Sequence, residues 1–128
     1  MIRYLLDTNI CIYMAVGCPP SVAARVDACF SSEVAISSIT LAELEHGVLK
    51  KGTHDQLQRI RARLQVLPFD EAAARCFADI AVLSTRQRSA MDKLIAAHAL
   101  SLGATLVTNN EADYMGYPIA IENWAVPA

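Results

Sequence analysis

The chain has 128 residues, 54% of them hydrophobic, which is enough for one domain with a substantial core and too little for two. No apolar run approaches the roughly 18 to 20 residues of a transmembrane helix. The N-terminus reaches Asp7 after only a short apolar run, unlike a secretory signal. We therefore expect a single cytoplasmic domain over residues 1–128, with no membrane association.

Charge and cysteine spacing argue against two further kinds of protein. Eleven Lys and Arg against 13 Asp and Glu give a net charge of −2, so the chain lacks the basic excess that binds nucleic acid by electrostatics alone. Binding of RNA would need metal ions or local basic patches. The four cysteines form no C-x-x-C pair, so we expect free thiols rather than a disulfide framework or a zinc site.

The first half of the chain predicts two junctions between a strand and a helix. Residues 2–6 are apolar and strand-like, and they end at Asp7, Thr8 and Asn9, residue types that favour the start of a helix. A second strand is expected over residues 34–36, followed by a helix over 41–50 that Gly52 ends.

The second half continues this alternation. Further helices are expected over residues 56–64, 70–83 and 89–102, and further strands over 65–67, 105–107 and 119–121. Asp70 and Ser89 are suited to start the last two helices, and Gly103 to end the last one. Strands alternating with helices predict an α/β domain with a mainly parallel central sheet flanked by helices.

Acidic and amide side chains gather at the predicted carboxyl ends of the strands. Asp7 closes the first strand, Glu43 lies one turn into the helix after the second, and Asn110 and Asp113 follow the strand at 105–107. Asp92 starts an apolar helix and shares its inner face by helical spacing. In open α/β sheets the ligand site lies beyond this edge, so we expect these groups to converge there.

Converging carboxylates repel one another, and a fold keeps several together chiefly when a cation neutralises them. Ligands that offer only oxygen suit Mg²⁺ or Mn²⁺, which activate water and stabilise the oxygens of a phosphodiester undergoing cleavage. The pattern thus favours a nuclease.

The same acids also fit a purely structural role. Asp7 or Thr8 would cap a helix, and the pairs Thr40 with Glu43 and Ser89 with Asp92 both match the capping box. On spacing alone, both interpretations stay open.

Four segments, taken in order, resemble the successive motifs of VapC-type toxins, the PIN-domain ribonucleases of bacterial toxin–antitoxin pairs. They are LLDTNI at residues 5–10, ISSITLAEL at 36–44, MDKLIAAHAL at 91–100 and LVTNN at 106–110. The match continues to the ending IENW at residues 121–124 and covers essentially the whole chain.

The resemblance implies a PIN-like fold in which Asp7, Glu43 and Asp92 bind one or two Mg²⁺ ions, with Mn²⁺ as a substitute, for cleavage of RNA. Many PIN domains carry a fourth acid where this chain has Asn109 and Asn110. Asn110 or Asp113 is therefore the candidate for the fourth ligand. The resemblance also implies a VapB-like antitoxin as partner and a homodimer.

Two basic stretches are candidates for phosphate binding. Arg86, Arg88 and Lys93 flank Asp92 and are the better placed to hold substrate phosphates beside the acids. The other stretch, which includes Lys50 and Lys51, is interpreted as a solvated face.

Two other functions remain open on the sequence. One is a different phosphoryl-transfer hydrolase, since Asp7-x-Asn9 loosely matches phosphatases that use an aspartyl nucleophile. The other is a catalytically silent module that binds an antitoxin or assembles with other proteins, with its acids serving only as helix caps.

Overall fold

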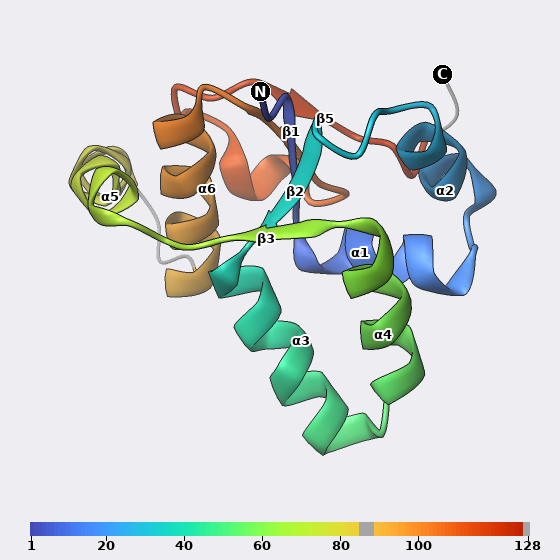
Figure 1. Cartoon of the computed structure of the whole chain (residues 1–128). Helices are drawn as coiled ribbons and strands as arrows, with labels where there is room; N and C mark the ends of the chain where they lie inside the picture. The colour runs from blue at the N-terminus through green and yellow to red at the C-terminus, as the bar shows by residue number, and fades with distance from the viewer. Residues whose placement is uncertain (85–88, 127–128) are drawn as a thin grey trace.

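A five-stranded sheet, parallel throughout, forms the centre of the protein (Figure 1). The structure is a computed structural model that describes residues 1–84 and 89–126. The strand order is β3-β2-β1-β4-β5. The strands are β1 (Tyr4–Leu6), β2 (Val34–Ser37), β3 (Gln65–Leu67), β4 (Thr105–Val107) and β5 (Ile121–Glu122).

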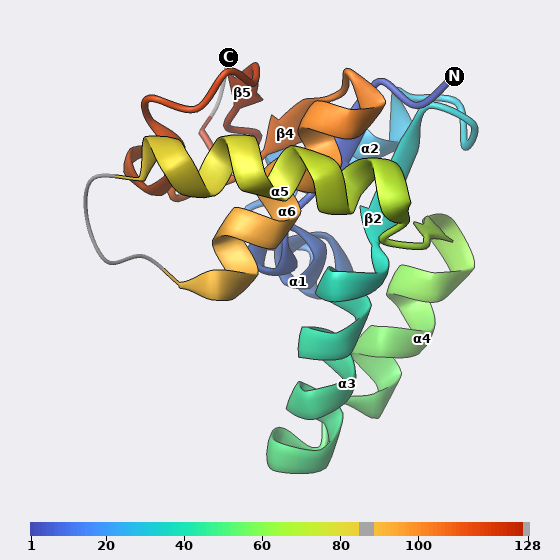
Figure 2. The same cartoon turned by 90° about the vertical axis from the view of Figure 1, so that its left-hand side faces the viewer.

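Helices cover both faces of this sheet. They are α1 (Thr8–Val16), α2 (Pro20–Asp27), α3 (Ser38–Lys51), α4 (His54–Arg63), α5 (Glu71–Leu83) and α6 (Ala90–Leu102), with a 3₁₀ turn η1 (Glu111–Tyr114). Helices α5 and α6 lie side by side over one face, as Figure 2 shows. Helices α3 and α4 form a hairpin that projects away from the sheet (Figures 1 and 2).

The core consists of two apolar clusters, one on each face of the sheet. Leu6, Ile36 and Val107 point to the cluster that packs on α1, α2 and α4. Leu5 and Leu106 point to the other cluster, beneath α5 and α6. This alternation follows from the two-residue period of a strand, and burial on both faces is typical of a parallel sheet.

The predicted α/β class and parallel sheet are confirmed, while some element boundaries shift. The strands at 65–67 and 105–107 lie where the sequence predicts them, whereas the last strand is at 121–122 instead of 119–121 and the first begins at Tyr4. The helix expected over 41–50 begins three residues earlier, at Ser38, because the Ser37 hydroxyl accepts the Ile39 N–H.

This earlier start of α3 overturns one structural role considered for Glu43. The N-cap of α3 is Ser37 and not Thr40, so the capping box between Thr40 and Glu43 is wrong. By contrast, Asp7 and Ser89 do cap α1 and α6, as expected.

The apolar face of α2 is formed by Val22 and Val26 and does not extend to Phe30. Val22 and Val26 are fully buried, but α2 stops at Asp27 and the side chain of Phe30 is 78% exposed. A second such face, formed by residues 57, 60 and 64, is buried in the core.

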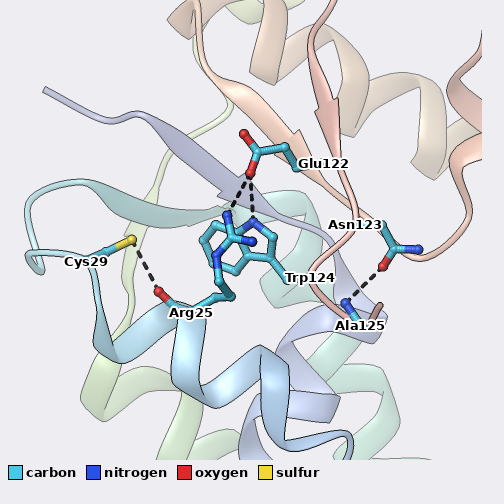
Figure 3. A network of polar contacts seen from close by, with 6 residues as sticks. All are labelled: Arg25, Cys29, Glu122, Asn123, Trp124 and Ala125. Carbon is cyan, nitrogen blue, oxygen red and sulfur yellow. Dashed lines mark hydrogen bonds and ion pairs between the residues drawn. The ribbon is translucent and has the colours of Figure 1, made fainter. Parts of the chain in front are cut away.

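A network of polar contacts holds the segment after β5 against α2 (Figure 3). The Trp124 indole N–H and the Arg25 guanidinium both donate to Oε1 of Glu122, at 2.9 and 3.0 Å. The guanidinium also lies 4.9 Å from the centre of the Trp124 ring. These contacts join the last strand to α2 across nearly the whole length of the sequence.

Two expectations about the whole chain concern its thiols and membranes. All four cysteines are free, as predicted. Within the described residues, no helix combines the length and the apolar character needed to cross a bilayer.

Ser37 also makes a second contact that ties two helices together. Its Oγ lies 2.8 Å from Nδ1 of His98, a core residue of α6 that is 1% exposed and packs edge-on against Phe69. Burial lowers the pKa of His98. His98 is therefore a core residue of α6 whose ring is held by a polar contact with Ser37.

Replacing Ser37 by Ala should destabilise the protein more than the loss of an ordinary helix cap. The variant removes the cap of α3 and also the partner of a buried imidazole, together about 2 to 4 kcal/mol. Ser89→Ala is the matched control, since among the described residues the hydroxyl of this exposed cap contacts only the Met91 N–H, and its loss costs about 1 kcal/mol. Urea denaturation measures both; equal losses would contradict the prediction.

Candidate active site

The sheet changes direction at β1, and this creates a crevice at its carboxyl end. From β1 the chain builds β2 and β3 on one side and then returns to place β4 and β5 on the other. Such a switch point is where ligands bind in open α/β sheets. Asp7 follows β1 at this point, and its N–H donates to the Val107 carbonyl at the end of β4, at 3.0 Å.

Asp7 combines both roles that its sequence position suggested. Its Oδ1 accepts the Ile10 N–H at 3.1 Å, so the side chain caps α1. A hydrogen bond from the Thr108 side chain supports the same carboxylate. The residue is nevertheless only 5% exposed, which is unusual for a carboxylate that serves as a cap alone.

The acidity of Asp7 shows how close the other acids are. Burial is the largest effect and raises the pKa of Asp7 from 3.8 to about 6, although the hydrogen bonds from Thr108 and Ile10 act in the opposite direction. The negative charges of Asp92 and Glu43 raise it further. The structure therefore brings together the three acids singled out in the sequence, and we call them the acid edge.

Side-chain hydroxyl groups bind the other two members of the acid edge. The Thr8 hydroxyl donates to Oε1 of Glu43 at 2.6 Å, which links α1 to α3. The Tyr114 hydroxyl donates to Oδ1 of Asp92 at 3.2 Å, which links η1 to α6. Both acids are half-buried.

Tyr114 is a residue of the site that the sequence analysis did not find. It is 1% exposed, and burial followed by the charges of Asp92 and Asp7 raises its pKa well above the usual value for tyrosine. The phenol therefore stays protonated and acts as a donor toward the carboxylates. Nothing in the sequence marks this tyrosine, because it lies in a short 3₁₀ turn that carries no periodic pattern.

The remaining candidate ligands lie in the segment that follows β4. Asn110 is exposed, and its N–H donates to Oγ1 of Thr108 at 3.0 Å. Asp113 is half-buried in η1. Their role as a fourth ligand stays a prediction.

The predicted phosphate-binding residues are only partly described. Lys93 is half-buried on α6, directly after Asp92. Arg86 and Arg88 lie outside the described residues. Phosphate binding by the three therefore remains a prediction.

The donor set of the acid edge suits a hard divalent cation. Its members offer only oxygen, and neither Asp7 nor Glu43 forms an ion pair with a Lys or Arg among residues 1–84 and 89–126. Burial is the main cause of the raised pKa of Asp7, and a cation would relieve the repulsion from Asp92 and Glu43 that adds to it. Over the same residues, no three His, Cys, Asp or Glu side chains are arranged to hold a metal ion.

A cleft of about 790 Å³ begins at this edge and runs between α1 and the α3–α4 hairpin. Thr8, Glu43 and Met91 line it at the acid edge, and Lys50 and Lys51 line it near the tip of the hairpin. Its walls include the side chains of Ile12, Leu57 and Ile60. We call this space the hairpin cleft.

With this fold and site in place, comparison with known proteins identifies the class. Residues 4–113 match the model of the PIN domain, and the chain belongs to the PIN-domain family.

The similar proteins narrow the class to the VapC type. Ribonuclease VapC2 of Rickettsia felis is 37% identical over 94% of this chain and 97% of the relative. The tRNA(fMet)-specific endonuclease VapC of Shigella flexneri is 35% identical over 89% and 91%. The crystal structure of DNA-bound VapBC from Salmonella typhimurium superimposes with a TM-score of 0.84, at 34% identity, over 97% of this chain and 99% of that one.

The raised pKa of Asp7 predicts that its charge opposes folding in the absence of metal. Because the folded protein holds this proton more tightly, its contribution to stability is complete near pH 4 and is lost as the pH rises through about 6. The difference between a pKa of 3.8 and one of about 6 corresponds to roughly 3 kcal/mol. Asp7→Asn should therefore gain stability relative to the wild type between pH 4 and 7, measured by urea denaturation with chelator present.

The matched control is Asp70→Asn. Asp70 also caps a helix, with its Oδ1 accepting the Ala73 N–H at 3.0 Å, but it is exposed. The stability of Asp70→Asn relative to the wild type should change little over the same pH range. The prediction would be refuted if the free energies of unfolding of the wild type and of Asp7→Asn changed by the same amount between pH 4 and pH 7.

Proposed function

We propose that the protein is a magnesium-dependent endoribonuclease and the toxin of a toxin–antitoxin pair, with the acid edge as its active site. The observation that carries this proposal is the buried Asp7 carboxylate, whose pKa is raised to about 6 beside Glu43 and Asp92. The names of the VapC relatives, which include ribonuclease and tRNA endonuclease, support the choice of RNA as the substrate.

Asp7, Glu43 and Asp92 would hold the ion, and Mn²⁺ would replace Mg²⁺. When bound, such an ion lowers the pKa of water and stabilises negative charge on phosphodiester oxygens. Mg²⁺ usually keeps several waters and takes only one or two carboxylates directly, so a loosely gathered acid edge suits it. Either one or two ions fit this proposal.

Hydroxyl donors hold two of the three acids from behind. The Thr8 hydroxyl donates to Oε1 of Glu43, and the Tyr114 hydroxyl donates to Oδ1 of Asp92. These contacts fix the orientation of the acids before the substrate arrives, which is the usual role of groups behind a metal ligand. Arg86, Arg88 and Lys93 would position the RNA by its phosphates without reading its sequence.

A protein partner belongs to the same proposal. Several similar solved structures are toxin–antitoxin complexes, and those from Rickettsia felis and Salmonella typhimurium also contain DNA. We propose that a VapB-like antitoxin inhibits this chain by covering the acid edge, that the chain forms a homodimer, and that it acts in the cytoplasm.

The decisive experiment uses the purified chain, free of antitoxin, with Mg²⁺ or Mn²⁺ and single-stranded RNA. The wild type should bind Mn²⁺ in calorimetry and cleave the RNA. Asp7→Asn, Glu43→Gln and Asp92→Asn should each weaken Mn²⁺ binding by about 100-fold or more, since even groups behind the ligands contribute 10- to 100-fold. Asp70→Asn, an exposed helix cap, should match the wild type.

Each other outcome assigns a different function. Binding of Mn²⁺ without cleavage of RNA would indicate another phosphoryl-transfer hydrolase. Failure to bind Mn²⁺ at all would indicate a catalytically silent module, with the acids as caps.

The fourth ligand should be revealed by the same Mn²⁺ titration. If Asn110 contributes through its side-chain oxygen, Asn110→Ala weakens binding and Asp113→Asn does not. If Asp113 reaches the ion, the order reverses. A tenfold or larger change in the dissociation constant for only one of the two variants would identify the ligand, and no change in either would exclude both residues.

A further inference from the structure

We propose that the hairpin cleft guides the RNA strand away from the acid edge, with Lys50 and Lys51 binding its phosphates. This inference rests on the proposed ribonuclease function and adds to it a path for the substrate. It also assigns a role to a basic stretch that the sequence analysis treated as a solvated face.

One face of α3 connects the acid edge to the two lysines. His46, Gly47 and Lys50 follow Glu43 at intervals of three, four and seven residues, so all four lie on the same side of the helix. The hairpin cleft is lined by all of them. Lys50 thus lies two helical turns, about 10 Å, from the level of Glu43 along the helix axis, a distance that a short run of nucleotides spans.

The positive charges at the far end of the cleft complement the negative phosphates of a single RNA strand. Lys50 and Lys51 are exposed, and neither forms an ion pair within the part of the chain that the structure describes. A strand whose scissile phosphate lies at the acid edge would bring later phosphates to these cations. Because the chain as a whole has a net charge of −2, phosphate binding has to come from local basic sites, of which Lys50 and Lys51 form one.

The walls between the two ends suit the rest of a nucleotide. Ile12, Leu57 and Ile60 form apolar walls beside the exposed imidazole of His46. Apolar side chains of this kind remove the faces of bases and riboses from water without selecting a sequence. The hairpin cleft adjoins the acid edge at one end and carries two cations at the other. Both features favour RNA over a protein segment as the occupant.

The test measures binding instead of cleavage. A fluorescently labelled single-stranded RNA is titrated, by anisotropy and at several salt concentrations, into the full chain carrying Asp7→Asn to prevent hydrolysis. In this background, Lys50→Gln and Lys51→Gln should each weaken binding and reduce the slope of log K against log salt by about 0.7, the value for one phosphate contact on a single strand.

Arg61→Gln is the matched control, because it also removes one exposed positive charge from the hairpin. Arg61 lies on α4 beside a separate shallow hollow and does not line the hairpin cleft. Its slope should stay that of the parent. Thermal melts check that all three variants remain folded.

Two results would overturn the inference. Lysine variants with the affinity and salt slope of Arg61→Gln would show that the lysines serve only the negative end of α3 or another occupant of the cleft. An equal loss in all three variants would show a diffuse charge effect. Either result leaves the proposed ribonuclease standing as long as the wild type cleaves RNA with metal, so the two failures are distinguishable.

Discussion

The contact between the Asp7 carboxylate and the start of α1 is the interaction on which the site depends. By accepting the Ile10 N–H, the side chain is held at the end of β1, where burial raises its pKa to about 6. A free carboxylate would turn to solvent instead, because ionised groups lose free energy of hydration when they are buried. The start of α1 therefore holds the Asp7 carboxylate at a buried position from which the sheet alone would exclude a charged group.

Each of the three acids around the crevice accepts a hydrogen bond from a side-chain hydroxyl group. Thr108 supports Asp7, Thr8 supports Glu43, and Tyr114 supports Asp92. A hydroxyl donor stabilises a carboxylate without adding a positive charge, so it leaves the acid able to attract a cation. The same region would lose its attraction for a metal ion if lysine or arginine supplied these contacts.

Much of the fold follows from local patterns in the sequence. Short apolar strands, capping residues and the glycines at positions 52 and 103 locate most elements to within a few residues, and both glycines end helices in the left-handed conformation. The start of α3 was misplaced because Ser37, Ser38 and Thr40 are all good caps. Tertiary contacts select the first of them: Ser37 packs against His98, and the Ser38 hydroxyl instead accepts the Phe69 N–H at 2.9 Å.

The site divides in the same way between what the sequence predicts and what it does not. Asp7, Glu43 and Asp92 are recognisable because each lies at or within two turns of the start of a helix near the same edge of the sheet. Tyr114 is not, since its place at Asp92 depends on how η1 turns after β4. The hairpin cleft is hidden for a related reason: it lies between three helices whose packing no single segment specifies.

The contact between Ser37 and His98 has a geometric consequence for the two helices that carry Glu43 and Asp92. Ser37 precedes Glu43 by six residues, and His98 follows Asp92 by six, so the 2.8 Å contact joins α3 and α6 on the far side of both acids. The positions of the two helices that carry these carboxylates are thus constrained relative to each other by one polar contact buried in the core. A substitution at Ser37 or His98 would therefore change how Glu43 and Asp92 lie relative to each other, although neither acid is itself replaced.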